Sequence, residues 1–558
     1  MKSVFARLPA LSWLQAYQRP WLTADLLAGI TVAMMLIPQA MSYAMLAGVP
    51  PYMGLYASVL PLIIYALFGT SRHLAVGPVA MVALLVASGV AVLAEPGSPE
   101  YIELVITLAL MIGVIQLLMG VFRLGFLTNF MSHPVISGFT SAAALIIGFS
   151  QLAALTGLVL PRTENIFLLS WLTLTNAANV HLLTFTLGLS GVMFLLAMKK
   201  WLPKLPAAML LMIISTLLVW LGQWQLQGVR VVGQVPAGLP DFALPSLAWG
   251  NVQALLPMAL TISFIAFMES IAVAKKIANE QGYAIKANQE LVGLGLANVA
   301  ASVFRGMPVT GGFSRTALNT SAGAKTPLAA MITALVVGLS LLTLTPLFFY
   351  IPMASLAAVI MVAVINLFDW HEVKHLWQVK REDLALWGLS FAATLVLGVK
   401  LGILLAIVGS MLWFVIKTTR PHYAVLGQLP GTDLWRNQAR YPEAQSLPGL
   451  LALRFDAQFY YGNVSFFQEV VAEQLAKGQG WRWVLLDASS INQLDSSADS
   501  ALHDMVKSLR KQGIELHFAA VKGPVLDVMH RSGFIERLGE DHFHPSMGAA
   551  LNHFYQPN

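Results

Sequence analysis

Two short segments carry most of the structural information in this sequence: Gly77-Pro78-Val79 and Gly311-Gly312-Phe313-Ser314-Arg315. Each interrupts a hydrophobic stretch, and the two occupy corresponding places in two halves of the chain. Gly and Pro breaks in corresponding apolar segments are a good sequence indication of a transporter's binding site. A helix that begins inside a membrane directs free N–H groups and the positive end of its dipole toward its neighbour. Two such helix ends facing one another predict an anion site.

The composition places most of the chain in a lipid bilayer. Of its 558 residues, 57% are hydrophobic and 11% are charged, whereas soluble domains carry about 25% charged residues. Apolar runs recur along the chain before Pro421 and predict about fourteen membrane segments, some of them short or broken. The chain contains no cysteine, which excludes disulfides and thiolate metal sites.

The distribution of basic residues supports this segment count. With an even number of segments and a cytoplasmic N-terminus, alternate connections should be basic. Lys and Arg gather in those connections, while the outer connection Glu95-Pro96-Gly97-Ser98-Pro99-Glu100 is acidic. We therefore expect both termini in the cytoplasm. Topology accounts for the net charge of +6, so no nucleic-acid partner is expected.

The density of charged residues rises sharply near Pro421. We expect a membrane transporter domain over residues 1–421, a linker over 422–437 and a soluble cytoplasmic domain over 438–558. An alternation of strands and helices in that last region is typical of an α/β sandwich. The expected strands cover 450–455, 481–487 and 515–520, and the expected helices cover 464–475, 497–512 and 525–531.

The apolar segments also carry the motifs of a known family. The run from Ile37 to Gly48 (Ile-Pro-Gln-Ala-Met-Ser-Tyr-Ala-Met-Leu-Ala-Gly) resembles the first-helix motif of sulfate permeases. This is the SulP family, which includes the animal anion exchangers related to prestin and pendrin. Matching motifs follow at Val76-Gly77-Pro78, at Glu269-Ser270-Ile271-Ala272-Val273-Ala274-Lys275 and from Pro308 to Arg315. The C-terminal region resembles the STAS domain that ends most members.

The resemblance implies a polytopic α-helical membrane protein like the uracil permeases, with about seven segments in each of two inverted repeats. A core domain would carry the substrate and move against a gate domain, and a cytoplasmic α/β STAS domain would follow. The implied activity is secondary active anion transport by alternating access. The implied setting is a homodimer in the lipid of a bacterial inner membrane, with both termini in the cytoplasm.

The resemblance also assigns the site. The substrate-binding positions are Gln39, Tyr43, Gly77, Pro78, Val79, Gly312, Phe313, Ser314 and Arg315, and the ion-coupling position is Glu269. Independently of any family, a guanidinium in the membrane core is functional by default, and its fork suits oxyanions such as sulfate. The alternative is that Arg315 only pairs with Glu269 or holds backbone carbonyls. Gln39 and Tyr43 are four residues apart, hence on one helix face, where ordinary packing is the competing interpretation.

Glu269 leaves more than one mechanism open. A carboxyl group after an apolar run can bind a proton, help to bind sodium when ionised, or only balance Arg315. Its sequence context resembles sulfate–proton members, whereas cyanobacterial bicarbonate–sodium members tend to have Asp, with a Thr where this chain has Val273. We predict proton-coupled sulfate transport. The alternatives are sodium- or proton-coupled bicarbonate or dicarboxylate transport, an uncoupled anion channel, and a sensor that reports to the STAS domain.

Other motifs are weaker. Asp495-Ser496-Ser497 resembles the phosphorylated loop of anti-sigma-factor antagonists, so Ser496 and Ser497 are possible regulatory positions, although a plain helix N-cap is the first expectation. The histidines show no ligand spacing on a common face, and His371 and His375 lie in a basic loop. We therefore expect neither a metal site nor a cofactor. Without a catalytic triad or a phosphate-binding loop, we expect neither an enzyme nor a primary pump.

Overall fold

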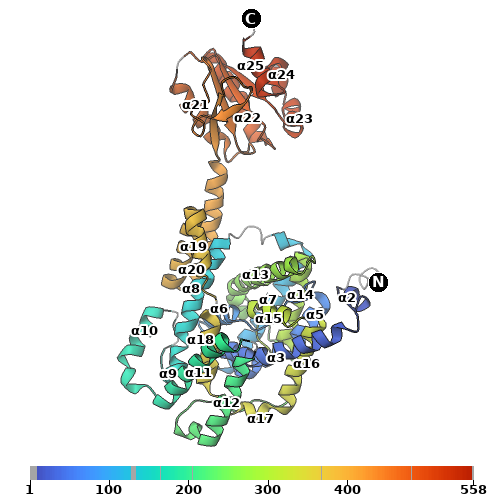
Figure 1. The fold of residues 1–558 in the computed structure, drawn as a ribbon, viewed down its shortest axis with the longest axis vertical. Helices are drawn as coiled ribbons and strands as arrows, with labels where there is room; N and C mark the ends of the chain where they lie inside the picture. Colours follow the sequence, from blue (N-terminus) through green and yellow to red (C-terminus); the bar gives the residue numbers. More distant parts are fainter. Residues whose placement is uncertain are drawn as a thin grey trace. The chain divides into compact units, whose positions relative to one another are not determined.

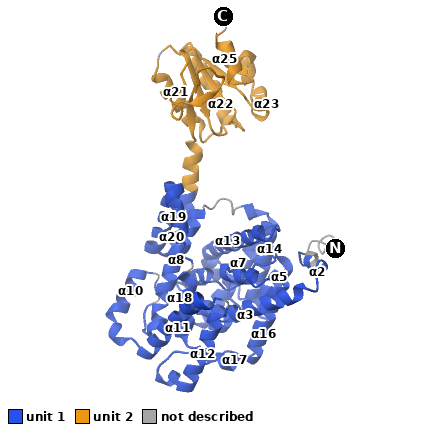
Figure 2. Ribbon diagram, viewed as in Figure 1, with its two compact units in different colours: residues 1–410 blue, residues 411–558 orange. Residues whose placement is uncertain are grey.

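The chain divides into two compact units, residues 1–410 and 411–558, in a computed structural model (Figure 2). The structure describes residues 9–126, 133–161, 163, 165–203, 205–365, 367–478 and 480–555. Unit 1 is almost entirely helical, whereas unit 2 contains a six-stranded sheet covered by helices (Figure 1). The change of architecture agrees with the change in charge density along the sequence.

Unit 1 is built from apolar helices of very different lengths. Eight helical stretches in the described part of the chain are long and apolar enough to cross a membrane, and shorter apolar helices lie between them. The helices are α2 (Pro9–Gln15), α3 (Trp21–Leu46), α4 (Pro51–Tyr56), α5 (Leu60–Phe68), α6 (Ala80–Val90), α7 (Pro99–Val121), α8 (His133–Ser150), α9 (Leu152–Thr156), α10 (Ile166–Thr175), α11 (Leu182–Trp201), α12 (Ala207–Gly222), α13 (Trp249–Glu280), α14 (Ala287–Val303), α15 (Phe313–Ser321), α16 (Leu328–Thr343), α17 (Thr345–Phe348), α18 (Met353–Ile365), α19 (Trp370–Val379) and α20 (Arg381–Thr419). Helix α20 is kinked at Gly398, and its last residues belong to unit 2.

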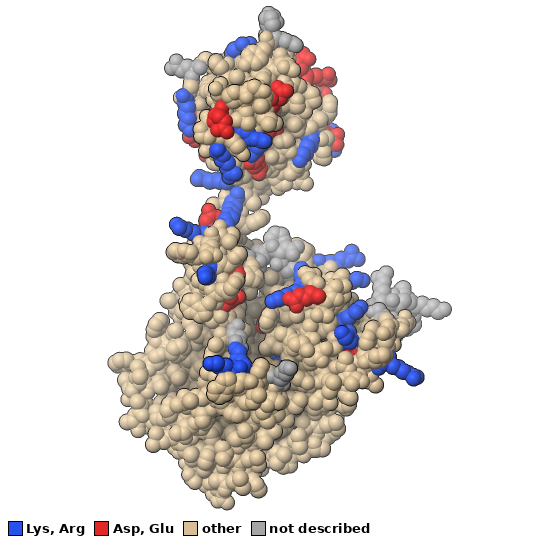
Figure 3. Space-filling model, in the orientation of Figure 1, with Lys and Arg blue, Asp and Glu red and all other residues tan. Residues whose placement is uncertain are grey.

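The surface of unit 1 fits a lipid environment. Large apolar side chains are exposed on successive helices, among them Trp171 on α10, Phe185 and Met193 on α11, and Leu217 and Trp220 on α12. Most of the face of this unit seen in Figure 3 carries neither basic nor acidic side chains. Soluble monomers rarely expose apolar patches of this extent. The chain is therefore a polytopic helical membrane protein.

Helices α7 and α14 pack backbone against backbone. A Cβ atom on Gly113 of α7 would lie 2.8 Å from the carbonyl oxygen of Gly295, and a Cβ on Gly295 would lie 2.8 Å from the carbonyl oxygen of Gly113. Small residues allow helices in membranes to approach this closely. Beside this contact, the Asn298 side chain of α14 donates a hydrogen bond of 3.1 Å to Gln116 of α7. Helix α14 is thus held tightly in the interior of unit 1.

Two very short strands lie where the sequence predicts broken helices. Strand β1 (Val76–Gly77) pairs antiparallel with β2 (Thr310–Gly311), so that Val76 lies opposite Gly311. All four residues are buried. Backbone N–H and C=O groups in a membrane must be satisfied within the protein, and this pairing satisfies part of them. Helix α6 begins directly after β1, and α15 directly after β2.

Helix α14 fixes the segment that leads into β1. Glu290 on this helix is completely buried. Its carboxylate accepts hydrogen bonds from the backbone N–H of Thr70 at 2.6 Å and of Ser71 at 3.0 Å. The Tyr65 hydroxyl, on α5, donates to the same carboxylate at 2.5 Å. The turn between α5 and β1 therefore rests on one buried side chain of α14.

The same helix also fixes the segment that leads into β2. The Asn298 side chain donates to the carbonyl oxygen of Val309 and accepts from its N–H, both at 2.9 Å. This two-way bond gives Val309 the partners that a neighbouring strand would give. Through Glu290 and Asn298, one helix positions both of the interruptions that the sequence reveals.

Unit 2 is a mixed sheet with helices on both faces. The strand order is β4-β3-β5-β6-β7-β8; β3 runs antiparallel to β4 and β5, and the remaining neighbours are parallel. The strands are β3 (Tyr423–Gln428), β4 (Trp435–Asn437), β5 (Leu450–Phe455), β6 (Trp483–Asp487), β7 (Glu515–Ala519) and β8 (Phe543–His544). The helices are α21 (Val464–Ala476), α22 (Ser496–Lys511), α23 (Gly523–Arg531), α24 (Phe534–Leu538) and α25 (Met547–Tyr555). Each face of the sheet has its own apolar core.

The expected linker at residues 422–437 is wrong. These residues form β3 and β4 and belong to the sheet. Strand β3 pairs along β5, with Tyr423 opposite Phe455 and Val425 opposite Leu453. A short strand whose partner lies farther along the chain has no strong local signal, which is why the composition suggested a linker. The expected strand at 450–455 coincides with β5.

The Glu290 network predicts a large effect on stability. Glu290→Ala removes the acceptor of two backbone N–H groups and of two hydroxyls, those of Tyr65 and Thr70, and each unsatisfied buried donor costs about 1–3 kcal/mol. We expect a clearly lower thermal denaturation midpoint for the detergent-purified protein. Glu280→Ala, at the exposed end of α13, is the control and should melt like the wild type. Equal midpoints for Glu290→Ala and the wild type would contradict the assigned role.

The sheet topology predicts where an independently folding fragment must begin. A fragment of residues 422–558 retains β3 and β4 and should be soluble and unfold cooperatively. A fragment of residues 438–558 exposes the edge of β5, and unpaired apolar strand edges promote aggregation. Circular dichroism and size-exclusion chromatography of the two fragments compare them directly. If the shorter fragment is equally stable and monomeric, β3 and β4 contribute nothing to the fold of unit 2.

Candidate functional site

The starts of α6 and α15 form the framework of the site. Their N-caps are Val79 and Gly312, each in extended conformation, and each lies within two residues of the paired strands β1 and β2. The first N–H groups of a helix have no partner within the helix and carry a partial positive charge. Two helix ends that start from one small sheet therefore bring two sets of donors into the same region, as expected from the sequence.

Arg315 lies in the first turn of α15 and is the largest fully buried side chain of the described chain, with 1% of its surface exposed. Its Nη1 atom donates a hydrogen bond of 2.8 Å to the carbonyl oxygen of Pro78. The same atom lies 3.5 Å from Oε1 of Gln39 on α3. One guanidinium thus links α15, the junction between β1 and α6, and α3. The structure brings together Gln39, Pro78 and Arg315 as predicted.

The Nε and Nη2 atoms form the other edge of the Arg315 guanidinium, and this edge has no partner among the described residues. The Nε and Nη2 atoms of Arg315 are buried, and no residue in the described part of the chain accepts a hydrogen bond from them. These two atoms form the fork that binds oxyanions with two parallel hydrogen bonds. Buried charged donors without acceptors are costly. An oxyanion at this edge would supply the acceptors that the protein does not.

Two glycines leave room for this arrangement. A Cβ atom on Gly312 would lie 2.8 Å from Nη2 of Arg315, which is closer than a real contact allows. A Cβ on Gly77 would lie 3.4 Å from the same atom. Any larger residue at position 312 would displace the guanidinium. The predicted positions Gly77 and Gly312 therefore act through the space that they leave around Arg315.

Glu269 lies on α13, near the same group. Its Oε2 atom is buried, and no described residue donates a hydrogen bond to it. Glu269 is near enough to Arg315 to interact with its charge, but no direct ion pair joins these two described residues. Tyr43 of α3 is buried. The adjacent Ser270 hydroxyl accepts a hydrogen bond of 2.8 Å from the N–H of Gly311. Helix α13 is therefore attached to β2 one residue away from the carboxyl group.

Two of the predicted substrate-binding residues, Phe313 and Ser314, are exposed. Phe313 is 50% exposed and lies against Lys276, whose Nζ atom is 5.3 Å from the centre of its ring. Ser314 is exposed as well, whereas Val79 is buried. Phe313 and Ser314 thus lie outside the buried group that surrounds Arg315. The structure does not bring their side chains to the guanidinium.

Several positioning residues were not assigned a role from the sequence. Glu290 and Asn298 hold the segments before β1 and β2, and the Thr316 hydroxyl accepts a hydrogen bond of 3.0 Å from the N–H of Ala75. All three are completely buried. A polar side chain inside an apolar helix indicates a functional role or a structural hydrogen bond. Glu290 and Asn298 could have been singled out from the sequence for this reason.

In unit 2, the start of α22 has the expected helix cap. The Asp495 carboxylate accepts a hydrogen bond of 2.8 Å from the N–H of Ala498, which confirms the N-cap interpretation. Ser496 and Ser497 follow as the first helical residues, and both are exposed. Their regulatory role stays a prediction.

Comparisons with known proteins agree with this architecture. The model of the Sulfate permease family matches residues 22–390, and that of the STAS domain matches residues 441–550. A protein of Arabidopsis thaliana named "Probable sulfate transporter 4.2" is 38% identical over 552 residues, which cover 96% of this chain and 81% of that protein. A probable sulfate transporter of Mycobacterium tuberculosis is 34% identical over 547 residues, with 98% of each chain covered.

Solved structures show the same fold. The murine Solute Carrier 26 family member A9 anion transporter, in the inward-facing state, superposes with a TM-score of 0.91 at 24% identity, covering 100% of this chain and 95% of that one. The transmembrane domain of a cyanobacterial bicarbonate transporter superposes with a TM-score of 0.60 at 24% identity, covering 71% of this chain and 98% of that one. The fold agrees with the two family models and the sequence relatives, which show that the chain belongs to the Sulfate permease family and carries a STAS domain.

Proposed function

We propose that this protein is a secondary active transporter that carries sulfate across the bacterial inner membrane together with protons. The observation that carries the proposal is the buried Nε–Nη2 edge of Arg315, for which the described chain offers no acceptor. It lies beside the paired starts of α6 and α15. A guanidinium fork and two helix N-termini together suit a compact oxyanion.

Sulfate is the substrate that fits these features best. Its four oxygens can accept from the Arg315 fork and from the N–H groups of both helix starts at the same time. Two relatives that match this chain over almost its whole length are named as sulfate transporters. Bicarbonate or a dicarboxylate would use the same fork and is the alternative substrate.

Alternating access is the mechanism that the internal bonding favours. Glu290 and Asn298 tie both interruptions to α14, which itself packs against α7 through glycines. The two helix starts and Arg315 can therefore move as one body past the remaining helices, without losing the geometry that binds the anion. In this scheme the substrate crosses the membrane with the part of the protein that binds it.

Glu269 is the proposed proton carrier. The Oε2 atom of its carboxyl group is buried and has no hydrogen-bond donor among the described residues, and the group is near enough to Arg315 to interact with its charge. Protonation of Glu269 removes a negative charge near the anion and strengthens anion binding. Release of the proton on the inner side would weaken the site and favour release of the anion.

Further features of the proposal concern assembly and regulation. The transporter would work as a homodimer surrounded by lipid, with both termini in the cytoplasm. The STAS domain would influence transport without contributing to the anion site, because every residue of that site precedes Thr316. Ser496 and Ser497, exposed at the start of α22, would be the positions for phosphorylation or for binding a partner.

Uptake into proteoliposomes tests the proposal. We expect labelled sulfate to accumulate when an inward proton gradient is imposed, and bicarbonate and dicarboxylates to compete weakly. Arg315→Ala should weaken sulfate binding by about one to two decades, since the loss of a charge-assisted hydrogen bond costs roughly 1.5–3 kcal/mol. Arg230→Ala, an exposed arginine of unit 1, is the matched control. Unchanged sulfate affinity in Arg315→Ala would remove this residue from the site.

A variant of Glu269 tests the coupling. Glu269→Gln imitates the protonated carboxyl group, so sulfate counterflow should persist while accumulation driven by the pH gradient disappears. Glu280→Gln, at the exposed end of the same helix, should behave like the wild type in both assays. A Glu269→Gln protein that still concentrates sulfate in response to the proton gradient would show that the proton is carried elsewhere. A response to sodium instead would favour the sodium-coupled alternative.

A further inference from the structure

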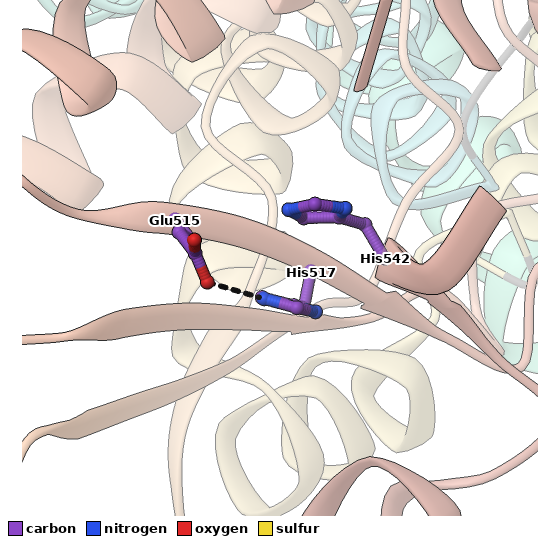
Figure 4. A group of neighbouring side chains, drawn as sticks. All are labelled: Glu515, His517 and His542. Atoms are coloured by element: carbon purple, nitrogen blue, oxygen red, sulfur yellow. Dashed lines mark hydrogen bonds and ion pairs between the residues drawn. The ribbon is translucent and has the colours of Figure 1, made fainter. Parts of the chain in front are cut away.

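One face of the sheet in unit 2 carries a cluster of histidines that the transport mechanism does not use. Glu515 and His517 project from β7, His542 lies in a short 3-10 helix at residues 540–542, and His544 belongs to β8. In Figure 4, the side chains of Glu515, His517 and His542 lie close together. The register places His544 beside Ala519 of β7, so that residues 515, 517 and 544 share one face.

The distances within this group are those of potential metal ligands. One ligand atom from each of Glu515, His517 and His542 lies within 4.8 Å of the other two. The Oε2 atom of Glu515 and the Nε2 atom of His517 are 3.4 Å apart. Ligand atoms at about 2.0–2.2 Å from a tetrahedral zinc ion are themselves roughly 3.4 Å apart. The rings of His517 and His542 are stacked, with 4.4 Å between their centres, so the His542 ring has to rotate before both rings can direct a nitrogen at one ion.

His517 is held in place by its surroundings. Only 1% of its surface is exposed, and its ring stacks on Trp483 with 3.4 Å between the ring centres. Its Nδ1 atom is hydrogen-bonded at 3.0 Å to Nε2 of His544. Histidines that bind metals generally use their second ring nitrogen in such a bond, which fixes the ring and the tautomer. Because the Nδ1 atom of His517 is hydrogen-bonded to His544, the Nε2 atom of His517 faces Glu515.

His542 has a ring nitrogen without a hydrogen-bond partner among the described residues. The Nδ1 atom of His542 is buried, and no residue of the described chain forms a hydrogen bond with it.

We propose that Glu515, His517 and His542 form a binding site for a divalent transition-metal ion, with zinc(II) as the best fit. Imidazole and carboxylate ligands suit zinc, whereas magnesium and calcium prefer oxygen ligands alone. The site lies wholly within unit 2 and is independent of the anion site. It also departs from the expectations, drawn from the sequence, that the histidines show no ligand spacing on a common face and that the chain has no metal site.

The test uses the full chain in detergent, purified through a tag without histidines and stripped with a chelator. Titration with zinc chloride against a chromophoric competitor should reveal one saturable site. Glu515→Gln and His542→Gln should each weaken zinc binding at least about 10-fold, the loss seen when even an outer partner of a metal site is removed. Cobalt(II) in place of zinc should give visible absorption bands that disappear in both variants.

Two exposed residues of the same unit provide matched controls. Glu536→Gln and His530→Gln should leave the zinc affinity and the cobalt spectrum unchanged. Glu515 is itself exposed, so Glu515→Gln should melt like the wild type in zinc-free buffer, and a loss of binding would then not reflect unfolding. The proposal is overturned if the wild type shows no saturable site, or if Glu515→Gln and His542→Gln bind zinc as tightly as the wild type.

Discussion

Every polar group of an interrupted helix must find a partner inside the protein, because lipid offers none. The two interruptions in unit 1 meet this requirement together. Strands β1 and β2 pair with one another, Glu290 and Asn298 of α14 bond the segments that precede them, and Ser270 of α13 bonds the N–H of Gly311. The proposed anion site is thus positioned by described side chains that form no hydrogen bond with Arg315. The resulting geometry depends on the interior of the protein rather than on the substrate.

The main features of the site could be predicted from the sequence because they are local. Gly77-Pro78 and Gly311-Gly312 break apolar runs, and Arg315 is a charge where charges are rare. Their supporting contacts are not local. Glu290 reaches Thr70 across 220 residues, and a single sequence offers no means of pairing positions so far apart. Glu290 could be recognised as unusual from its apolar surroundings, but its partner could not be named.

The errors in unit 2 have the same cause. The segment that looked like a linker is a strand because β5, farther along the chain, pairs with it. Glu515 and His517 alternate on one strand, and that spacing alone could have indicated a shared face. His542 joins them only because β8 returns beside β7 in parallel register. Parallel strands are separated in the sequence by the segment that connects them. A search for regular spacing along the sequence therefore does not reveal that their residues are neighbours.

The opposite charges of Arg315 and Glu269 have an electrical consequence. If both side chains move with the anion, the ionised pair adds no net charge, and the unloaded carrier returns without work against the membrane potential. Moving one elementary charge across 100 mV costs about 2.3 kcal/mol. Sulfate with a single proton leaves one uncompensated negative charge, which an inside-negative potential opposes. Voltage-independent uptake therefore requires a second proton, and its carrier would have to be a group other than Glu269.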